Sequence, residues 1–318
     1  MKAGWTPRNT GWRDEEADKV IDLMDRIAGG PITWGVTGSP ETSHQLDRER
    51  VLDEMKQVGL SATELGPDGF LPPDPDELRD FVSARGLRIA GGFVSAVMHR
   101  QDRFDADLDY FERAARQLAA VGGEIFVLGP DTHLDALDTR LEMDEAEWAT
   151  LFLNLRHLQE LAAAHGLGTA LHPHWGMSIE QSAHVDRIMA SSDVDLCLDT
   201  GHLFLGNADP VEIARRAPER VTHVHLKDVD GELAEQLRAG ALTFDGAARR
   251  GLFTPLGAGD VDIAGVIEVL EANGFEGWYV LEQDTAFDTA PAIGEGPIVD
   301  ARVSVEFLRS LPASSSSA

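Results

Sequence analysis

Short apolar runs alternate with longer amphipathic runs along most of this chain, and few folds accommodate such an alternation. Each short run is rich in β-branched or other apolar residues, as a buried strand requires, and each longer run has helical spacing. Eight such pairs follow one another, which indicates repeated β-α units and a parallel sheet. The predicted strands are residues 32–37, 62–65, 88–94, 125–128, 168–171, 194–198, 221–226 and 278–281.

The longer runs predict helices with recognisable ends. The first expected helix begins with Asp47, a typical N-cap residue, and ends at Gly59, a typical C-cap residue. The next begins with Asp74 as N-cap and Pro75 at the first helical position, where the missing N–H of proline is tolerated. The expected helices span residues 47–59, 74–84, 106–121, 145–165, 179–190, 210–217, 263–273 and 297–311.

The number and spacing of these units predict an α/β fold, the (β/α)8 TIM barrel. A doubly wound open sheet is the competing fold, but no glycine-rich phosphate-binding motif follows any predicted strand. We therefore expect the barrel over residues 32–311. An N-terminal extension over residues 1–31, with a short helix at residues 15–27, precedes it, and a Ser-rich disordered tail over residues 312–318 follows.

One predicted connection is unusually long. Residues 228–260 separate the seventh strand from the seventh helix, where most such loops have about 2 to 6 residues. This segment contains its own helical run at residues 232–239 and the buryable side chains of Phe244, Leu252 and Phe253. We interpret it as a lid over the end of the barrel.

The charge balance excludes some classes of partner. With 27 Lys and Arg against 55 Asp and Glu, the formal net charge is −28, which argues against nucleic acid. The acids are spread along the whole chain, so we attribute the excess to solubility. A single cysteine, Cys197, rules out an internal disulfide, and neither a signal peptide nor a run of about 20 apolar residues is recognisable. We expect a cytoplasmic protein with no membrane partner.

Polar residues gather where the last four predicted strands end, and barrel enzymes build their active sites at that end. Five of the eleven histidines lie there. Because side chains alternate along a strand, His172 and His174 share one face, and so do His223, His225 and Lys227. Both sets can therefore point into the barrel.

These residues predict a metal site. Asp199, Glu282, His225 and one of the two strand-five histidines would offer two carboxylates and two imidazoles, a set suited to Mn²⁺, Co²⁺ or Zn²⁺ rather than Ca²⁺. For any one of these histidines taken alone, hydrogen bonding to a polar neighbour is the better explanation. Four adjacent strands that all end in ligand types favour the metal.

The same segments carry a family resemblance. HPHWG at residues 172–176, LDTGH at 198–202, HVHLKDV at 223–229 and LEQD at 281–284 resemble the xylose isomerase-like barrels of sugar isomerases, epimerases and dehydratases. Within that superfamily they are most similar to the inosose dehydratase branch, as are TELGP at residues 63–67 and the pattern of the long loop. The resemblance covers nearly the whole barrel.

The resemblance implies one divalent metal, Mn²⁺ or Co²⁺ first and Zn²⁺ or Mg²⁺ as alternatives. Its ligands would be an acid from strand five, Asp199, His225 and Glu282. This chain departs from the pattern at strand five, where His172 replaces the usual Glu, so the fourth ligand is His172, His174 or water.

The implied chemistry assigns further roles. Glu64 and the strand-five histidine that does not bind metal, His174 if His172 is the ligand, are the candidate base and acid. Lys227 would stabilise the developing oxyanion, although an ion pair with a nearby carboxylate explains it equally well. The expected substrate-binding or orienting residues are His202, Trp34, Trp175 and His99.

The resulting hypothesis is a metal-dependent dehydratase that removes water from a keto-cyclitol such as 2-keto-myo-inositol through an enediolate. A ketose isomerase or epimerase, or β-elimination of a 3-keto-glycoside, would use the same site. A non-catalytic sugar-binding barrel is the alternative from another class. The resemblance also implies a small keto-polyol or sugar as the partner and pairing of barrels into a homo-oligomer.

Overall fold

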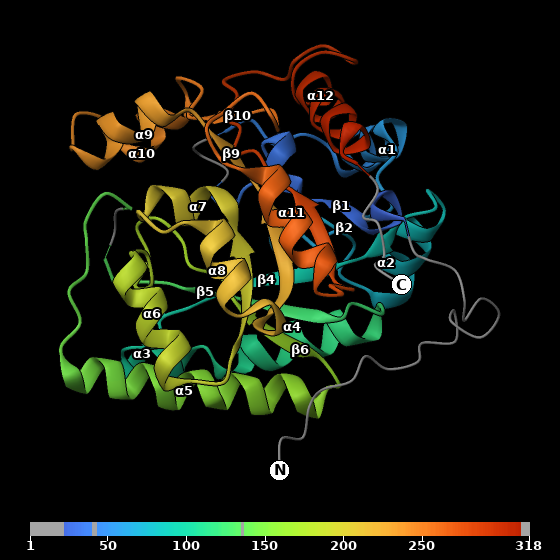
Figure 1. Cartoon of the computed structure of the whole chain (residues 1–318). Coiled ribbons are helices and arrows are strands. Elements are labelled where there is room, and N and C mark those ends of the chain that lie inside the picture. The colour runs from blue at the N-terminus through green and yellow to red at the C-terminus, as the bar shows by residue number, and fades with distance from the viewer. Residues whose placement is uncertain (1–21, 40–42, 135–136, 313–318) are drawn as a thin grey trace.

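A parallel barrel surrounded by helices forms the molecule in this computed structural model, which describes residues 22–39, 43–134 and 137–312 (Figure 1). In this part of the chain, nine strands form one sheet in the order β3-β2-β1-β11-β8-β7-β6-β5-β4, with every pairing parallel. The strands are β1 (Ile27–Gly29), β2 (Ala62–Thr63), β3 (Arg88–Ile89), β4 (Gly91–Ala96), β5 (Ile125–Pro130), β6 (Gly168–Leu171), β7 (Asp195–Asp199), β8 (Val221–Leu226) and β11 (Trp278–Leu281).

The two end strands of this sheet close the ring. β3 pairs with β2 and β4 pairs with β5, and a single residue, Ala90, separates β3 from β4. The two segments therefore act as one barrel strand. The backbone N–H of Leu65 also donates to the carbonyl of Gly91, which joins β4 to the chain after β2. The predicted (β/α)8 barrel is confirmed.

Helices cover the outside of the barrel and match most of the predicted ranges. Asp74 caps the second predicted helix through the backbone N–H groups of Asp76 and Glu77, and Asp144 with Glu147 forms a capping box. The helices are α1 (Arg48–Val58), α2 (Pro75–Ser83), α3 (Gln101–Ala106), α4 (Leu108–Ala120), α5 (Glu145–Ala164), α6 (Ser182–Ser191), α7 (Thr200–Leu205), α8 (Pro210–Arg216), α11 (Ile263–Ala272) and α12 (Pro297–Ser310).

The first strand corrects the sequence prediction. Residues 32–37 form no strand. Pro31–Trp34 is instead a 3₁₀ turn, because Pro31 has no N–H for a ladder and Gly35 takes a left-handed backbone conformation with φ of 74°. The fully buried strand Ile27–Gly29 pairs with β11 and β2 in its place. The barrel therefore begins before the expected boundary at residue 32. Most of the helix expected over residues 15–27 lies outside the described residues, and its end, Leu23–Arg26, is a 3₁₀ turn.

The long connection after the seventh barrel strand is a folded unit, which we call the lid segment (residues 228–260). It contains β9 (Asp228–Val229), α9 (Gly231–Arg238), α10 (Phe244–Ala248) and β10 (Phe253–Thr254), and β9 pairs antiparallel with β10. Figure 1 shows these elements together at one end of the molecule, beside α7. The buried carboxylate of Asp228 accepts from the backbone N–H groups of Val229, Gly257, Gly259 and Val261, which holds the two ends of the segment together.

Buried apolar side chains of the outer helices, such as Leu52, Phe111 and Leu155, belong to one large hydrophobic core cluster. Among the described residues, no helix combines the length and the apolar composition that crossing a bilayer requires.

Candidate metal centre and active site

A cavity of about 1180 Å³ opens where the barrel strands end at their carboxyl termini. This is the end at which TIM barrel enzymes place their chemistry. Polar lining residues lie at the ends of several strands, and apolar ones come from strand β4 as well as from the surrounding loops. The lining includes Glu64, Phe93, Tyr110, His172, His174, Met177, His225, Lys227, Phe244, Glu282 and Asp284.

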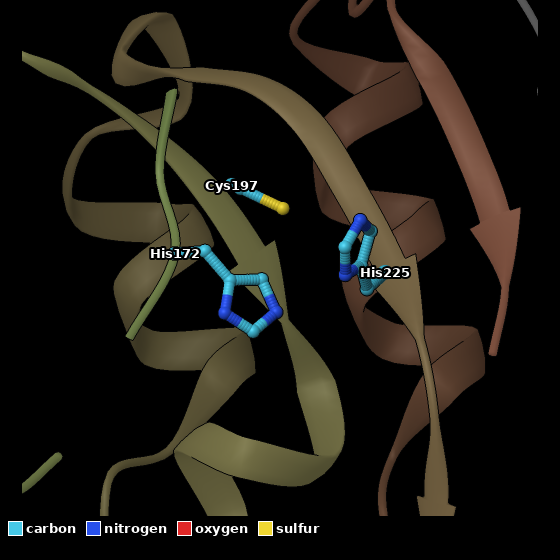
Figure 2. Close-up of side chains that lie close together, drawn as sticks. All are labelled: His172, Cys197 and His225. Carbon is cyan, nitrogen blue, oxygen red and sulfur yellow. The ribbon is translucent and has the colours of Figure 1, made fainter. Parts of the chain in front are cut away.

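Four ligand-type side chains converge on one side of this cavity. One nitrogen or oxygen atom from each of His172, Asp199, His225 and Glu282 lies within 4.8 Å of the others. His172 Nε2 is 3.2 Å from Asp199 Oδ2. His225 Nδ1 is 3.2 Å from Glu282 Oε2 and 3.6 Å from Asp199 Oδ2. Figure 2 shows His172 and His225 turned toward one another, with the thiol of Cys197 near both.

Strand order explains this convergence. β6, β7, β8 and β11 are neighbours in the sheet, and the ligand-type residues lie at or just beyond their carboxyl ends. The register pairs Asp199 with His225, so these two side chains are fixed next to each other by backbone hydrogen bonding. His223 and His225 both point into the barrel, where they contact Glu64, as the alternation of side chains along this strand predicts.

The donor atoms fit a divalent cation. His225 Nδ1 is buried and has no hydrogen-bond partner in the described structure, although two carboxylate oxygens lie close to it. An imidazole nitrogen beside two carboxylates is a common binding site for a transition metal. The geometry also groups His172, rather than His174, with the other three residues. The sequence left that choice open.

His174 lies next to the four ligand-type residues, but its ring makes different contacts. Its Nδ1 donates to the carbonyl of Trp175 at 2.6 Å, which leaves Nε2 as the nitrogen that can accept a proton. The His174 and His202 rings are 3.6 Å apart at their centroids. Burial, with the nearby His172 and Lys227, lowers the pKa of His174 to about 3. His202 is also buried, and its backbone N–H donates to Asp199 Oδ1 at 2.7 Å.

Lys227 is a buried cation among three carboxylates. Its Nζ lies 2.9 Å from Asp284 Oδ1, 3.1 Å from Glu282 Oε2 and 3.5 Å from Asp199 Oδ2. Burial opposes its charge, but these carboxylates outweigh burial and hold the pKa of Lys227 well above its usual value. Gly201 makes room for the stem, because a Cβ there would lie 2.7 Å from Lys227 Cγ.

Aromatic side chains of the lid segment cover this charged group. Lys227 Nζ lies 5.2 Å from the centroid of the Phe253 ring, and the Phe244 ring lies 6.3 Å from those of both His174 and His202. The backbone N–H of Phe244 donates to Asp138 on the opposite loop at 2.8 Å. The lid segment thus places an apolar surface against the polar residues, which limits the access of water to them.

Glu64 lies on the other side of His225. Its Oε1 accepts from His223 Nε2 at 2.8 Å and from His225 Nε2 at 3.2 Å. Burial raises the pKa of Glu64, but His225 and His223 outweigh this effect, so the pKa lies below its usual range. Glu64 is therefore a buried, ionised partner of two imidazoles, and it also lines the cavity.

In the described structure, the cavity lining includes none of the four residues expected to bind substrate or to orient a ligand, which are His202, Trp34, Trp175 and His99. Trp34 follows the first strand in a 3₁₀ turn and packs on α1, and Trp175 is buried in the core with the Arg140 guanidinium 5.3 Å from its ring. His99 pairs with His133 at 2.9 Å.

Because Trp34 does not line the cavity, we expect Trp34→Phe to lower the stability of the fold without affecting substrate binding. Trp34 Nε1 donates to Glu54 Oε2 at 2.9 Å, and Glu54 is only 4% exposed. Removing the donor leaves a buried acceptor short of a partner, so we expect the free energy of unfolding to fall by about 1–3 kcal/mol. Urea denaturation measures that fall, and steady-state kinetics should show an unchanged KM. A raised KM at unchanged stability would contradict this assignment.

Several cavity residues were not predicted. Asp284 lies two positions after Glu282 but beyond the end of β11, where alternation along a strand no longer determines the direction of a side chain. Tyr110, on α4, and Phe244, in the lid segment, reach the cavity from outside the barrel strands. No local sequence signal marks Tyr110, whereas Phe244 belongs to the segment that the sequence predicts to be a lid.

Comparison with known proteins places this chain in a family. The family model described as xylose isomerase-like TIM barrel matches residues 52–311, and the chain belongs to that family. An inosose dehydratase from Lactiplantibacillus plantarum is 33% identical over 264 residues, which cover 80% of this chain and 87% of the relative.

Solved structures share the fold at lower identity. The IOLI protein, whose crystal structure has a bound zinc atom, has a TM-score of 0.67 at 15% identity and covers 90% of this chain and 97% of its own. The Escherichia coli 3-keto-D-glucoside 4-epimerase YcjR has a TM-score of 0.65 at 18% identity and covers 90% of this chain and 99% of its own.

Proposed function

We propose that this protein is a metal-dependent dehydratase that removes water from a keto-cyclitol such as 2-keto-myo-inositol. The observation that carries the proposal is the convergence of His172, Asp199, His225 and Glu282 beside a cavity that also contains His174 and Lys227. The inosose dehydratases that match most of this chain at about 30% identity support the substrate class.

The four converging residues would hold one divalent ion, Mn²⁺ or Co²⁺ by preference, with Zn²⁺ or Mg²⁺ as alternatives. The mixture of imidazole and carboxylate donors supports that choice. Such an ion supplies Lewis acidity, which polarises a ketone oxygen and acidifies the neighbouring C–H bond.

The remaining groups of the site would move a proton and stabilise charge. His174 lines the cavity and its Nδ1 is occupied by the Trp175 carbonyl, so Nε2 is the nitrogen that would take the α-proton of the substrate. The carbon–carbon double bond then forms as the β-hydroxyl leaves, and the proton taken up by His174 would convert that hydroxyl to water. The Lys227 ammonium would stabilise the negative charge that develops on the substrate oxygen.

Proton exchange and product analysis test this proposal. We expect Mn²⁺-loaded protein in deuterated water to exchange the α-proton of 2-keto-myo-inositol and to release water, both visible by NMR. Chelation should abolish both processes, and added Mn²⁺ should restore them. Exchange without water loss would indicate an isomerase or epimerase instead, and equal activity of chelated and loaded protein would exclude the metal mechanism.

A further inference from the structure

A buried carboxylate and a second histidine support His225 from the side opposite to the other ligand-type residues. Glu64 is 4% exposed and His223 is fully buried. Both His223 Nε2 and His225 Nε2 contact the same oxygen, Glu64 Oε1, at 2.8 and 3.2 Å. Glu64 and His223 are 159 residues apart in the chain, so this contact exists only in the folded barrel.

The two ring nitrogens of His225 therefore face different partners. Nε2 faces the Glu64 carboxylate, which can only accept a hydrogen bond when it is ionised. Nδ1 faces Asp199 and Glu282. A histidine that binds a metal ion is neutral and carries one proton, and the Glu64 carboxylate beside Nε2 would hold that proton there. The lone pair of Nδ1 is then directed at the two carboxylates, as a metal ligand requires.

His223 fixes the position of the Glu64 carboxylate beside His225. Its hydrogen bond to Glu64 Oε1 is shorter than that of His225. Gly91 leaves the space for this pair, because a Cβ at Gly91 would lie 3.3 Å from His223 Cε1 and 3.0 Å from the carbonyl oxygen of Ile125. A buried carboxylate that is fixed in this way can orient an imidazole without moving.

We propose that Glu64 is a positioning residue that fixes the proton of His225 on Nε2 and so prepares Nδ1 to bind the divalent metal. This inference rests on the proposed metal-dependent function. It replaces the expectation that Glu64 is the base or acid of the reaction. Partners of this kind, which bind the second nitrogen of a metal-binding histidine, typically contribute about 10- to 100-fold to metal affinity.

Direct metal titration of Glu64→Gln tests the assignment. The amide keeps the size of the side chain but no longer presents a charged acceptor to both imidazoles. We expect Mn²⁺ affinity, measured from free Mn²⁺ by electron paramagnetic resonance, to fall roughly 10- to 100-fold. At saturating Mn²⁺, the rate of proton exchange should return to within a few-fold of the wild type. His223→Asn should weaken Mn²⁺ binding in the same direction.

Glu54→Gln is the matched control. Glu54 is also 4% exposed and also accepts from two side chains, Trp34 and Arg50, but it lies on α1 away from the cavity lining. We expect this substitution to lower thermal stability and to leave Mn²⁺ affinity unchanged. The control separates loss of a buried carboxylate in general from loss of the one beside His225.

The outcomes separate this inference from the function on which it rests. If the wild type binds no divalent metal, the proposed function fails. If the wild type binds Mn²⁺ and Glu64→Gln binds it equally tightly, the positioning role is wrong. Unchanged affinity with exchange abolished at saturating Mn²⁺ would instead identify Glu64 as the base. If Glu54→Gln lowered Mn²⁺ affinity as much as Glu64→Gln does, the loss of affinity would reflect general destabilisation and the positioning role would be wrong.

Discussion

Replacing Asp199 by asparagine is expected to remove both metal binding and proton exchange. Asp199 Oδ2 faces His172, His225 and Lys227, and in Asp199→Asn a neutral amide with one oxygen takes its place. Replacing a residue that only supports a metal ligand lowers metal affinity by up to about 100-fold, so replacing the ligand itself should lower the affinity further. Mn²⁺ titration and NMR exchange on 2-keto-myo-inositol measure the two effects.

We expect Asp199→Asn to fold normally, because asparagine can also fill the second role of Asp199, which is to cap α7. Asp199 Oδ1 accepts from the backbone N–H of His202 and caps α7, and asparagine caps helices equally well. Asp209→Asn is the matched control, since Asp209 caps α8 outside the cavity lining. It should change neither Mn²⁺ affinity nor exchange. A fully active Asp199→Asn variant would refute the site.

The repeat of strands and helices could be predicted because each strand carries its own local pattern. The strand expected over residues 221–226 is observed as Val221–Leu226. The first strand could not be found in this way. Ile27–Gly29 is short and contains Ala and Gly, so only its pairing with β11 and β2 marks it as a strand. The β-branched run after it looked more like a strand, but Pro31 and Gly35 make it a turn.

The site could be predicted to the extent that strand alternation determines it. His225 and Asp199 lie within strands, so their inward direction followed from spacing. His172 and His174 lie beyond the end of β6, where alternation no longer applies, and the Trp175 carbonyl decides how His174 turns. Contacts between distant segments, such as Glu64 with His223, have no signature in either segment alone.

Replacing Lys227 by methionine should have the opposite effect on metal affinity from Asp199→Asn. The ammonium of Lys227 lies beside the same carboxylates of Asp199 and Glu282 that would bind the cation. Its removal takes away a competing positive charge, so Lys227→Met should bind Mn²⁺ at least as tightly as the wild type. The turnover number should nevertheless fall about 10²- to 10³-fold, the usual cost of losing one group that stabilises a developing oxyanion. Mn²⁺ titration and steady-state kinetics measure the two effects.

Stability gives an independent check on the same substitution. Without metal, Lys227→Met removes the ammonium from the buried carboxylates of Asp199 and Glu282 and from the half-buried carboxylate of Asp284, and breaking a buried ion pair costs about 3–5 kcal/mol. A bound divalent ion stabilises only the folded state and supplies the missing charge, so Mn²⁺ should raise the melting temperature more in the variant than in the wild type. Lys56→Met, at an exposed lysine, is the control and should change neither property. Full turnover in Lys227→Met would show that Lys227 serves only to balance the three carboxylates.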